Sequence, residues 1–320
     1  MSLRRRLLVV LAIVLPVCLA GWVAWRSTRA DGDRTPGAAP VPAASSPTAS
    51  SSTAAAEEPS PAASPSLSPS LSPSGSAGPD GRDGAEDPDE PLRGRVVVLD
   101  PGHNPGNREH VREIARRVDV GTHRKECDTT GTATNAGYPE AAFTLDVTRR
   151  ARALLEERGA VVVLTHDGDR PFGPCVDERA VIGNEAGADA AVSVHADGSG
   201  EGNRGFHVIV PARVTAGAAD TTGITGPSRR LGRHLVDAFA EATGTGTADY
   251  LGGAVADTGL VTRGDLGGLN LSRVPKVFLE CGNMRDARDA GLLTDPAWRD
   301  RAAHGIADGV TAHLLDTDGR

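Results

Sequence analysis

The chain has 320 residues, of which 39% are hydrophobic, 24% charged and only 3% aromatic, and it contains four cysteines. Residues 1–30 hold five arginines and no acid, residues 31–93 hold ten acids and three arginines, and residues 94–320 hold 32 acids and 26 bases. No region after the N-terminus is basic enough to make nucleic acid the main partner, and four cysteines are too few for a fold built from disulfides.

The first 30 residues have the pattern of an export signal. Three consecutive arginines at residues 4–6 precede an apolar run, residues 7–25, that contains no charge. As a helix this run would extend about 29 Å, close to the thickness of a bilayer's hydrocarbon core. The positive flank predicts a signal anchor with the rest of the chain across the membrane. Pro16 and residues 18–20 keep a cleaved signal peptide open as the alternative. Both alternatives predict a protein that works outside the cytoplasm and is associated with the cell wall. A signal anchor would leave it attached to the membrane, and a cleaved signal peptide would leave it secreted.

Residues 31–93 predict a disordered linker. The segment is rich in Ala, Pro and Ser as far as residue 79, and it then becomes acidic. Such a composition buries too little apolar surface to offset the entropy of ordering the chain. We expect it to act as a spacer between the N-terminal segment and a folded domain.

Residues 94–320 predict a single α/β domain with a mostly parallel twisted sheet flanked by helices. Five short apolar runs have the character of buried strands: residues 96–99, 161–164, 191–194, 206–210 and 277–279. Four stretches between or after them have helical periodicity: residues 140–158, 176–186, 228–243 and 296–315. This alternation is typical of parallel sheets covered by helices. Gly159 is expected to cap the first helix.

Three ionisable side chains stand at the ends of predicted strands. His103 follows the first strand, His195 follows the run 191–194, and Glu280 ends the last strand. Because the carboxyl ends of parallel strands meet at one edge of a sheet, where ligands bind, we expect these side chains to lie close together.

Glu140 is expected to join them for a different reason. The helix it begins carries an apolar stripe at positions 143, 147, 151 and 154, and Glu140 falls on the same stripe. A carboxylate on the core side of a helix is costly unless it is paired or binds a metal.

Two imidazoles and a carboxylate are a typical ligand set for one catalytic Zn²⁺, and a further carboxylate can move protons during hydrolysis. The spacing alone leaves open which glutamate binds and which acts as the base. Other chemistries lack their motifs: the chain has no Gly-x-Ser-x-Gly, no His-Glu-x-x-His and no glycine-rich loop ending in Lys-Ser/Thr, so neither a serine nucleophile nor a bound nucleotide is expected.

Four motifs in order resemble a known family. They are Asp100-Pro101-Gly102-His103, Glu140 opening a helix, Ser193-Val194-His195-Ala196-Asp197, and residues 277–283, Val-Phe-Leu-Glu-Cys-Gly-Asn. Together they resemble the zinc-dependent N-acetylmuramoyl-L-alanine amidases of the Amidase_3 family. Residues 131–140, 173–179 and 204–208 make the resemblance closest to stand-alone mycobacterial-type cell-wall amidases.

The resemblance implies a phosphorylase/hydrolase-like amidase fold with His103, Glu140 and His195 as zinc ligands and Glu280 as the catalytic carboxylate. It also implies hydrolysis of the amide between N-acetylmuramic acid and L-alanine in peptidoglycan, serving cell-wall turnover or cell separation. The implied partners are muropeptides, and the N-terminal segment is expected to contact the membrane.

Three further expectations concern the orientation of the ligand imidazoles, a disulfide and alternative functions. Asp100 and Asp197 are expected to orient the ligand imidazoles as hydrogen-bond acceptors. Cys127 and Cys175 are expected to form a disulfide, which their placement in the resembling enzymes supports. Two alternative functions stay open: another zinc peptidase of the wall, such as a carboxypeptidase, and a non-hydrolytic wall-binding or activator protein.

Overall fold

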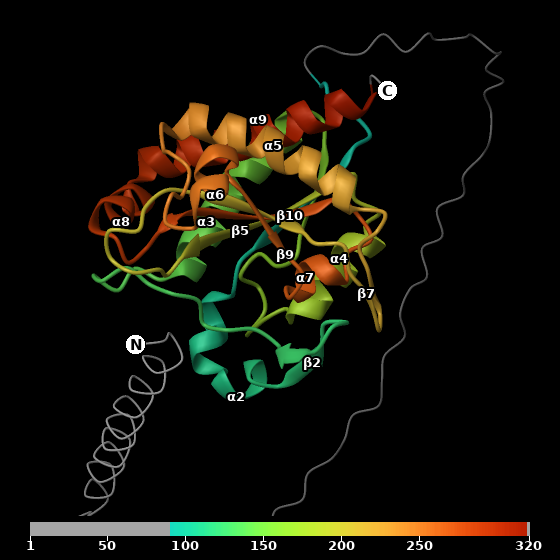
Figure 1. Ribbon diagram of the computed structural model, residues 1–320, viewed down its shortest axis with the longest axis horizontal. Coiled ribbons are helices and arrows are strands. Elements are labelled where there is room, and N and C mark those ends of the chain that lie inside the picture. The colour runs from blue at the N-terminus through green and yellow to red at the C-terminus, as the bar shows by residue number, and fades with distance from the viewer. Residues whose placement is uncertain (1–89, 319–320) are drawn as a thin grey trace, which may run out of the picture. The chain divides into compact units, whose positions relative to one another are not determined.

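A six-stranded sheet forms the centre of residues 90–318, the part of the chain that the computed structural model describes (Figure 1). Its strands follow the order β4 (Val161–Leu164), β1 (Val96–Pro101), β5 (Ala190–Asp197), β10 (Lys276–Asn283), β6 (His207–Pro211) and β9 (Leu260–Arg263). The first four are mutually parallel, whereas β6 pairs antiparallel with β10 and parallel with β9. The predicted mostly parallel sheet is therefore confirmed, although the sequence pattern did not indicate the reversal of β6 and β9.

Side chains alternate between two faces of this sheet, and the faces differ in chemistry. Val194 of β5 and Leu279 of β10 enter the main hydrophobic cluster. Their neighbours His195 and Glu280 instead line a cavity on the other side. We call these the apolar face and the polar face.

Three long helices cover the apolar face: α3 (Glu140–Glu157), α5 (Thr225–Thr243) and α9 (Pro296–Asp318). Phe143, Phe239 and Trp298, one from each helix, are fully buried there, and the Trp298 ring lies 6.5 Å from that of Phe143 and 6.0 Å from that of Phe239. Burying one such aromatic side chain stabilises the fold by about 1.5–3 kcal/mol. Most of the apolar core lies on this side of the sheet.

Shorter elements cover the polar face. They are α4 (Val176–Glu185), α7 (Gly267–Asn270) and a hairpin formed by β2 (Arg117–Asp119) and β3 (Arg124–Glu126). The predicted disulfide is present: Cys127, just after β3, is bonded to Cys175, just before α4. The hairpin is thereby attached covalently to the helix beside it.

The predicted long helices are found with small shifts at their ends. α3 begins at Glu140 as expected and is followed by Gly159, whose φ of +88° is the left-handed conformation that favours glycine after a helix. α5 begins three residues before the predicted start, and α9 runs three residues past the predicted end.

Several short elements lie outside the predictions. They are β2, β3, β9 and α7, already described, and η1 (Pro105–Glu109), α2 (Val111–Ile114), β7 (Thr215–Ala216), β8 (Ala219–Asp220), α6 (Gly253–Thr258) and α8 (Ala287–Thr294). Each is shorter than the window of about 11–18 residues over which a hydrophobic period is recognised, so the sequence pattern carries little signal for them.

The predicted N-terminal anchor or signal, residues 1–30, lies outside the described residues, as does the linker up to residue 89. Leu92, near the end of the predicted linker, is fully buried in the main hydrophobic cluster, and its amide donates to the carbonyl oxygen of Arg158. Within residues 90–318, no helix combines the length and the apolar character needed to cross a membrane.

Candidate metal centre

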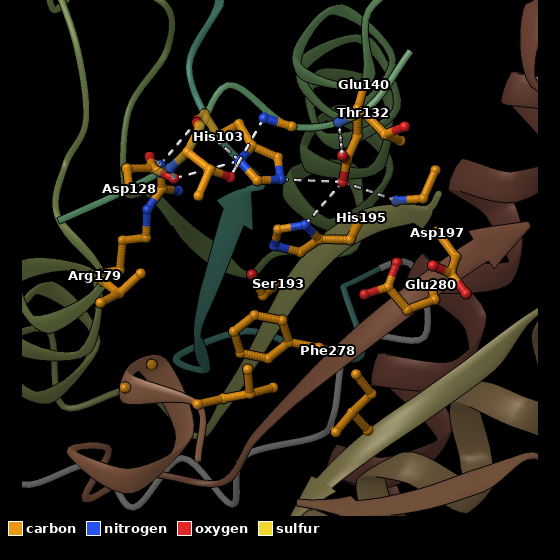
Figure 2. Close-up of a pocket in the computed structure, with 18 of the residues that line it drawn as sticks. His103, Asp128, Thr132, Glu140, Arg179, Ser193, His195, Asp197, Phe278 and Glu280 are labelled. Carbon is orange, nitrogen blue, oxygen red and sulfur yellow. Dashed lines mark hydrogen bonds and ion pairs between the residues drawn. The ribbon is translucent and has the colours of Figure 1, made fainter. Parts of the chain in front are cut away.

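A cavity of about 510 Å³ opens on the polar face, where the predicted site residues meet (Figure 2). His103, Glu140, His195 and Glu280 all line it. The hairpin, α4 and the segment leading into α7 form its other walls, which carry Lys125, Glu126, Val176, Arg263, Leu266, Gly267 and Gly268. Its volume is within the range of ligand sites, about 300–1,000 Å³.

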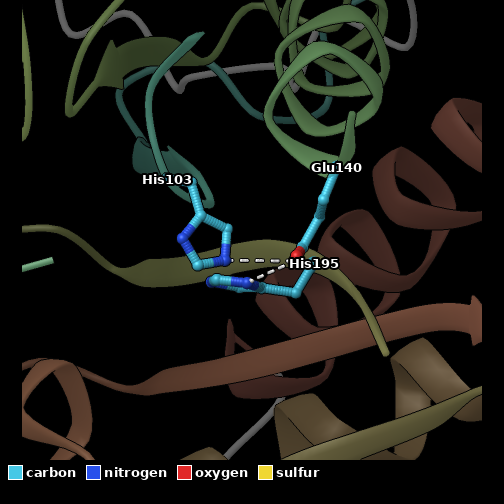
Figure 3. Close-up of side chains that lie close together, drawn as sticks. All are labelled: His103, Glu140 and His195. Carbon is cyan, nitrogen blue, oxygen red and sulfur yellow. Dashed lines mark hydrogen bonds and ion pairs between the residues drawn. The ribbon is translucent and has the colours of Figure 1, made fainter. Parts of the chain in front are cut away.

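Three side chains from three different elements converge on one point of this cavity (Figure 3). His103 lies just after β1, His195 lies in β5 and Glu140 is the first residue of α3. Oε1 of Glu140 is 3.3 Å from Nε2 of His103 and 3.0 Å from Nδ1 of His195. One ligand atom from each of the three residues lies within 4.8 Å of the other two.

These separations fit a divalent metal ion. Two ligands about 2.0 Å from a tetrahedral metal are about 3.3 Å apart. The observed 3.0 and 3.3 Å are close to that value. Two imidazole nitrogens and a carboxylate oxygen form a donor set that binds such ions readily. The cluster can therefore hold a metal ion and leave one position open toward the cavity.

Two glycines allow the side chains to approach so closely. A Cβ on Gly102 would lie 2.4 Å from Cε1 of His195, and one on Gly131 would lie 2.8 Å from Cδ2 of His103. Neither position has room for a larger residue. His103 itself has φ +62° and is the only non-glycine residue with positive φ in the described range. Such conformations occur where a site fixes the backbone.

The other nitrogen of His103 faces two acceptors. Nδ1 lies 3.1 Å from the carbonyl oxygen of Thr129 and 3.3 Å from a carboxylate oxygen of Asp128. Since a carbonyl oxygen only accepts, Nδ1 carries a hydrogen, which leaves Nε2 as the nitrogen that can bind a metal. Burial opposes a charge on His103, but Glu140 and Asp128 raise the pKa of this imidazole to about 10. A metal ion would displace the proton that this field favours.

Glu140 is held by backbone donors as well as by the histidines. The amide of Thr132 donates to Oε2 at 2.8 Å, and that of Ala196 donates to Oε1 at 3.2 Å. Burial alone would raise the pKa of Glu140, but His103 and His195 outweigh it and hold the pKa well below the ordinary value. The carboxylate is therefore ionised and ready to bind a cation.

A buried charge network lies beneath the cluster. Arg179 of α4 donates to Asp100 at 2.7 Å, to Asp128 at 2.9 Å and to the carbonyl oxygen of His103 at 2.9 Å. Lys276 of β10 donates to the other oxygen of Asp100 at 3.2 Å. Burial opposes ionisation of Asp100, but Lys276 and Arg179 hold its pKa well below the usual range. Arg179 thus connects Asp100 and the backbone of His103 to Asp128, the residue beside Nδ1 of His103.

The expected roles of Asp100 and Asp197 are wrong in this structure. Asp100 points to the polar face below the cavity, where the donors around it are Arg179, Lys276, Thr165 and Ser193. Asp197 accepts from the hydroxyl of Tyr250 at 2.5 Å and from the amide of Gly198 at 2.6 Å. Within residues 90–318, neither aspartate accepts a hydrogen bond from an imidazole. Asp128, which sequence reasoning missed, lies beside His103 instead.

Glu280 lies in β10 opposite His195 of β5, and Figure 2 shows it pointing into the cavity with Asp197 next to it. Burial raises the pKa of Glu280 well above its ordinary value, and the nearby carboxylates Glu140 and Asp197 raise it further. A carboxyl group with a raised pKa can take up and release a proton near neutral pH. Phe278 stacks on the His195 ring at 5.2 Å, on the same side of the strand.

Two further histidines near the strand ends and the cysteine after Glu280 lie outside the candidate metal centre. Nε2 of His166 lies 2.7 Å from the carbonyl oxygen of His103, so it donates to the backbone. His207 is buried opposite Glu280 in β6, and burial lowers its pKa to about 4. Cys281 is a buried free thiol in the hydrophobic cluster, on the face opposite Glu280 as strand alternation predicts.

Comparison with known proteins agrees with this geometry. The profile of the N-acetylmuramoyl-L-alanine amidase family matches residues 97–312. The chain is 38% identical over 230 residues to the N-acetylmuramoyl-L-alanine amidase Rv3717 of Mycobacterium tuberculosis, an alignment that covers 72% of this chain and 90% of that protein.

Two solved structures are similar in fold. The amidase Ami1 of Mycobacterium smegmatis has a TM-score of 0.64 and 38% identity, covering 70% of this chain and 99% of that one. The apo form of Ami1 from Mycobacterium abscessus has a TM-score of 0.62 and 39% identity, covering 70% of this chain and all of that one. The resemblance drawn from the four motifs is confirmed: the chain belongs to the N-acetylmuramoyl-L-alanine amidase family.

Proposed function

We propose that this protein is a zinc-dependent N-acetylmuramoyl-L-alanine amidase. It hydrolyses the amide between the lactyl group of N-acetylmuramic acid and the first L-alanine of the stem peptide. The observation that carries the proposal is the convergence of His103, Glu140 and His195 within 4.8 Å in a cavity that also contains Glu280. Membership of the amidase family supports the substrate class.

His103, Glu140 and His195 would hold the zinc ion, His103 through Nε2 and His195 through Nδ1. When bound, zinc supplies Lewis-acid polarisation of the scissile carbonyl. Thr129 and Asp128 keep the His103 ring in the tautomer that presents Nε2. The buried Arg179 holds Asp128 in place.

Glu280 acts as the proton carrier. Its carboxylate accepts a proton from the attacking water as the new C–O bond forms at the lactyl carbon. It then delivers that proton to the alanine nitrogen as the C–N bond breaks, leaving the lactyl carboxylic acid and a free amine, between which the remaining proton of the water then exchanges to give a carboxylate and an ammonium group. Burial and the neighbouring carboxylates raise the pKa of Glu280, which favours both transfers.

The division of the chain follows from this function. We propose residues 1–30 as a signal anchor or signal peptide, residues 31–93 as a linker and residues 94–320 as the catalytic domain. Peptidoglycan lies outside the cytoplasm, so the N-terminal pattern and the substrate agree on an extracytoplasmic site of action.

Digestion of purified muropeptides, followed by mass spectrometry, tests the proposal. We expect release of intact stem peptides with a free L-alanine amine, and loss of that release when a chelator removes the metal. Loss of one terminal residue from the stem would instead show a carboxypeptidase. Binding of muropeptides without any cleavage, in protein that carries zinc, would show a non-hydrolytic wall-binding protein.

A further inference from the structure

A second cavity lies away from the metal centre, between the first half of α5 and the end of α9. Its volume is about 500 Å³, and it shares no lining residue with the first cavity. It is lined by Gly226, Arg229, Arg230, Arg233, His234, Asp237 and Asp316. We call it the arginine groove.

The three arginines of this groove outnumber its two carboxylates. Within residues 90–318, His234 pairs with Asp316 at 3.5 Å, but none of Arg229, Arg230 and Arg233 forms an ion pair. Nε of Arg230 is buried and has no hydrogen-bond partner in the described part of the chain. Buried donors in folded proteins are nearly always paired with protein or water, so this one marks a position where an acceptor from outside the chain, a water or a ligand, can bind.

The positive charge is local to this groove. Residues 94–320 carry 32 acids and 26 bases, so the domain as a whole is negative. In the groove three guanidinium groups face two carboxylates, Asp237 and Asp316. A cluster of this kind on an acidic domain favours an anionic ligand at this one place.

Guanidinium groups match the oxygens of phosphate through paired N–H donors. We propose that the arginine groove binds the phosphate groups of an anionic polymer. Such binding would hold the domain on a phosphate-bearing wall polymer while the separate cavity at the metal centre stays open to its substrate. The retention of the domain on the wall rests on the proposed function, whereas phosphate binding itself can be measured without any hydrolysis.

The surroundings favour a polymer over an anionic membrane. A membrane-binding surface combines basic residues with several exposed apolar ones. Of the large hydrophobic side chains that the structure shows as exposed, only Leu315 is adjacent in sequence to a groove residue.

Calorimetric titration of the full chain with linear inorganic polyphosphate tests the proposal. We expect saturable binding that weakens with salt, and about a tenfold or larger rise in Kd for the double variant Arg230→Gln/Arg233→Gln. A second pair, Arg229→Gln/Arg233→Gln, changes two exposed side chains and should weaken binding similarly without a folding risk. Asp237→Asn removes a groove carboxylate and should lower Kd.

Arg301→Gln is the matched control, since Arg301 is exposed on α9 but lies outside the groove. It should change Kd less than about twofold. The proposal is overturned by an equal loss in this control, by absence of binding, or by equal affinity for polyglutamate of the same length. Binding to phosphatidylglycerol vesicles that requires the same arginines, with none to polyphosphate, would assign the groove to a membrane instead.

Discussion

The two faces of the central sheet are built from the same strands but are stabilised by different interactions, apolar packing on one face and buried hydrogen bonds and ion pairs on the other. On the apolar face, alternate side chains such as Val194 and Leu279 pack against three long helices. On the polar face, their neighbours in β5 and β10 include Ser193 and Lys276, which join Asp100 in a fully buried polar network. The three side chains of the candidate metal centre, His103, Glu140 and His195, lie at the rim of the polar face. The face with the weaker apolar core is thus the one that carries the candidate metal centre, and buried charge replaces apolar packing beneath it.

The largest effect is expected from breaking the buried charge network. Arg179→Met leaves Asp100 and Asp128 buried without their shared cation, so the free energy of unfolding should fall by about 3–5 kcal/mol. Urea unfolding followed by circular dichroism measures it. Arg170→Met is the control, because Arg170 pairs with Glu178 at the surface, where both are more than a third exposed. Its loss should cost less than about 1 kcal/mol. Equal losses would show that the network adds nothing.

A cavity on the apolar face should affect stability alone. Leu155 is fully buried in α3, so Leu155→Ala should lower the free energy of unfolding by about 2–5 kcal/mol. Because the polar face is untouched, zinc affinity of the folded protein should stay unchanged. Competition with a chromogenic chelator checks this, and a parallel loss of zinc affinity would mean that the two faces are not separable.

The environment of His103 should tune metal affinity. Asp128→Asn removes the carboxylate beside Nδ1 and should weaken zinc binding about 10- to 100-fold. Asp197→Asn is the matched control, since Asp197 bonds to Tyr250 rather than to an imidazole. We expect a change of less than about threefold from it. The reverse ranking in the same chelator competition would restore the original expectation for Asp197.

The smallest effect concerns acid stability. Lys276 and Arg179 hold the pKa of Asp100 below its ordinary value in the folded protein, whereas the unfolded chain takes up the proton at about pH 3.9. The stabilisation is therefore present above about pH 4 and is lost as the pH falls below that value. Asp100→Asn should be less stable at neutral pH but should lose less stability between pH 5 and pH 3. A parallel decline in both proteins would contradict this assignment.

The sequence predicted the parts of the fold that have a strong period. The valine-rich run of β1 and the apolar stripe of α3 were sufficient to predict these two elements. The positions of His103, His195 and Glu280 at strand ends, together with Glu140, were sufficient to predict that the four side chains meet in one cavity. The stripe also explains why Glu140 is buried. Short elements such as β9 lie in a glycine-rich connection and have no such period.

The polar network could not be predicted in the same way. Asp128 and Arg179 are 51 residues apart, and in sequence each has the character of an ordinary loop or surface-helix charge. Only the tertiary structure brings them together beside His103. Asp100 was misassigned because its distance from His103 in sequence is short, whereas strand geometry turns its carboxylate below the cavity toward Lys276.

We propose that His103, Glu140 and His195 bind one zinc ion and that Glu280 moves the proton. The most direct measurement is zinc content by mass spectrometry, together with muropeptide hydrolysis, for Glu140→Gln and Glu280→Gln. Both variants replace a carboxylate that lines the same cavity by its isosteric amide. We expect Glu140→Gln to lose most of its zinc, and Glu280→Gln to keep one zinc per chain while losing hydrolysis. Full zinc in the first variant, or full activity in the second, would contradict the assignment.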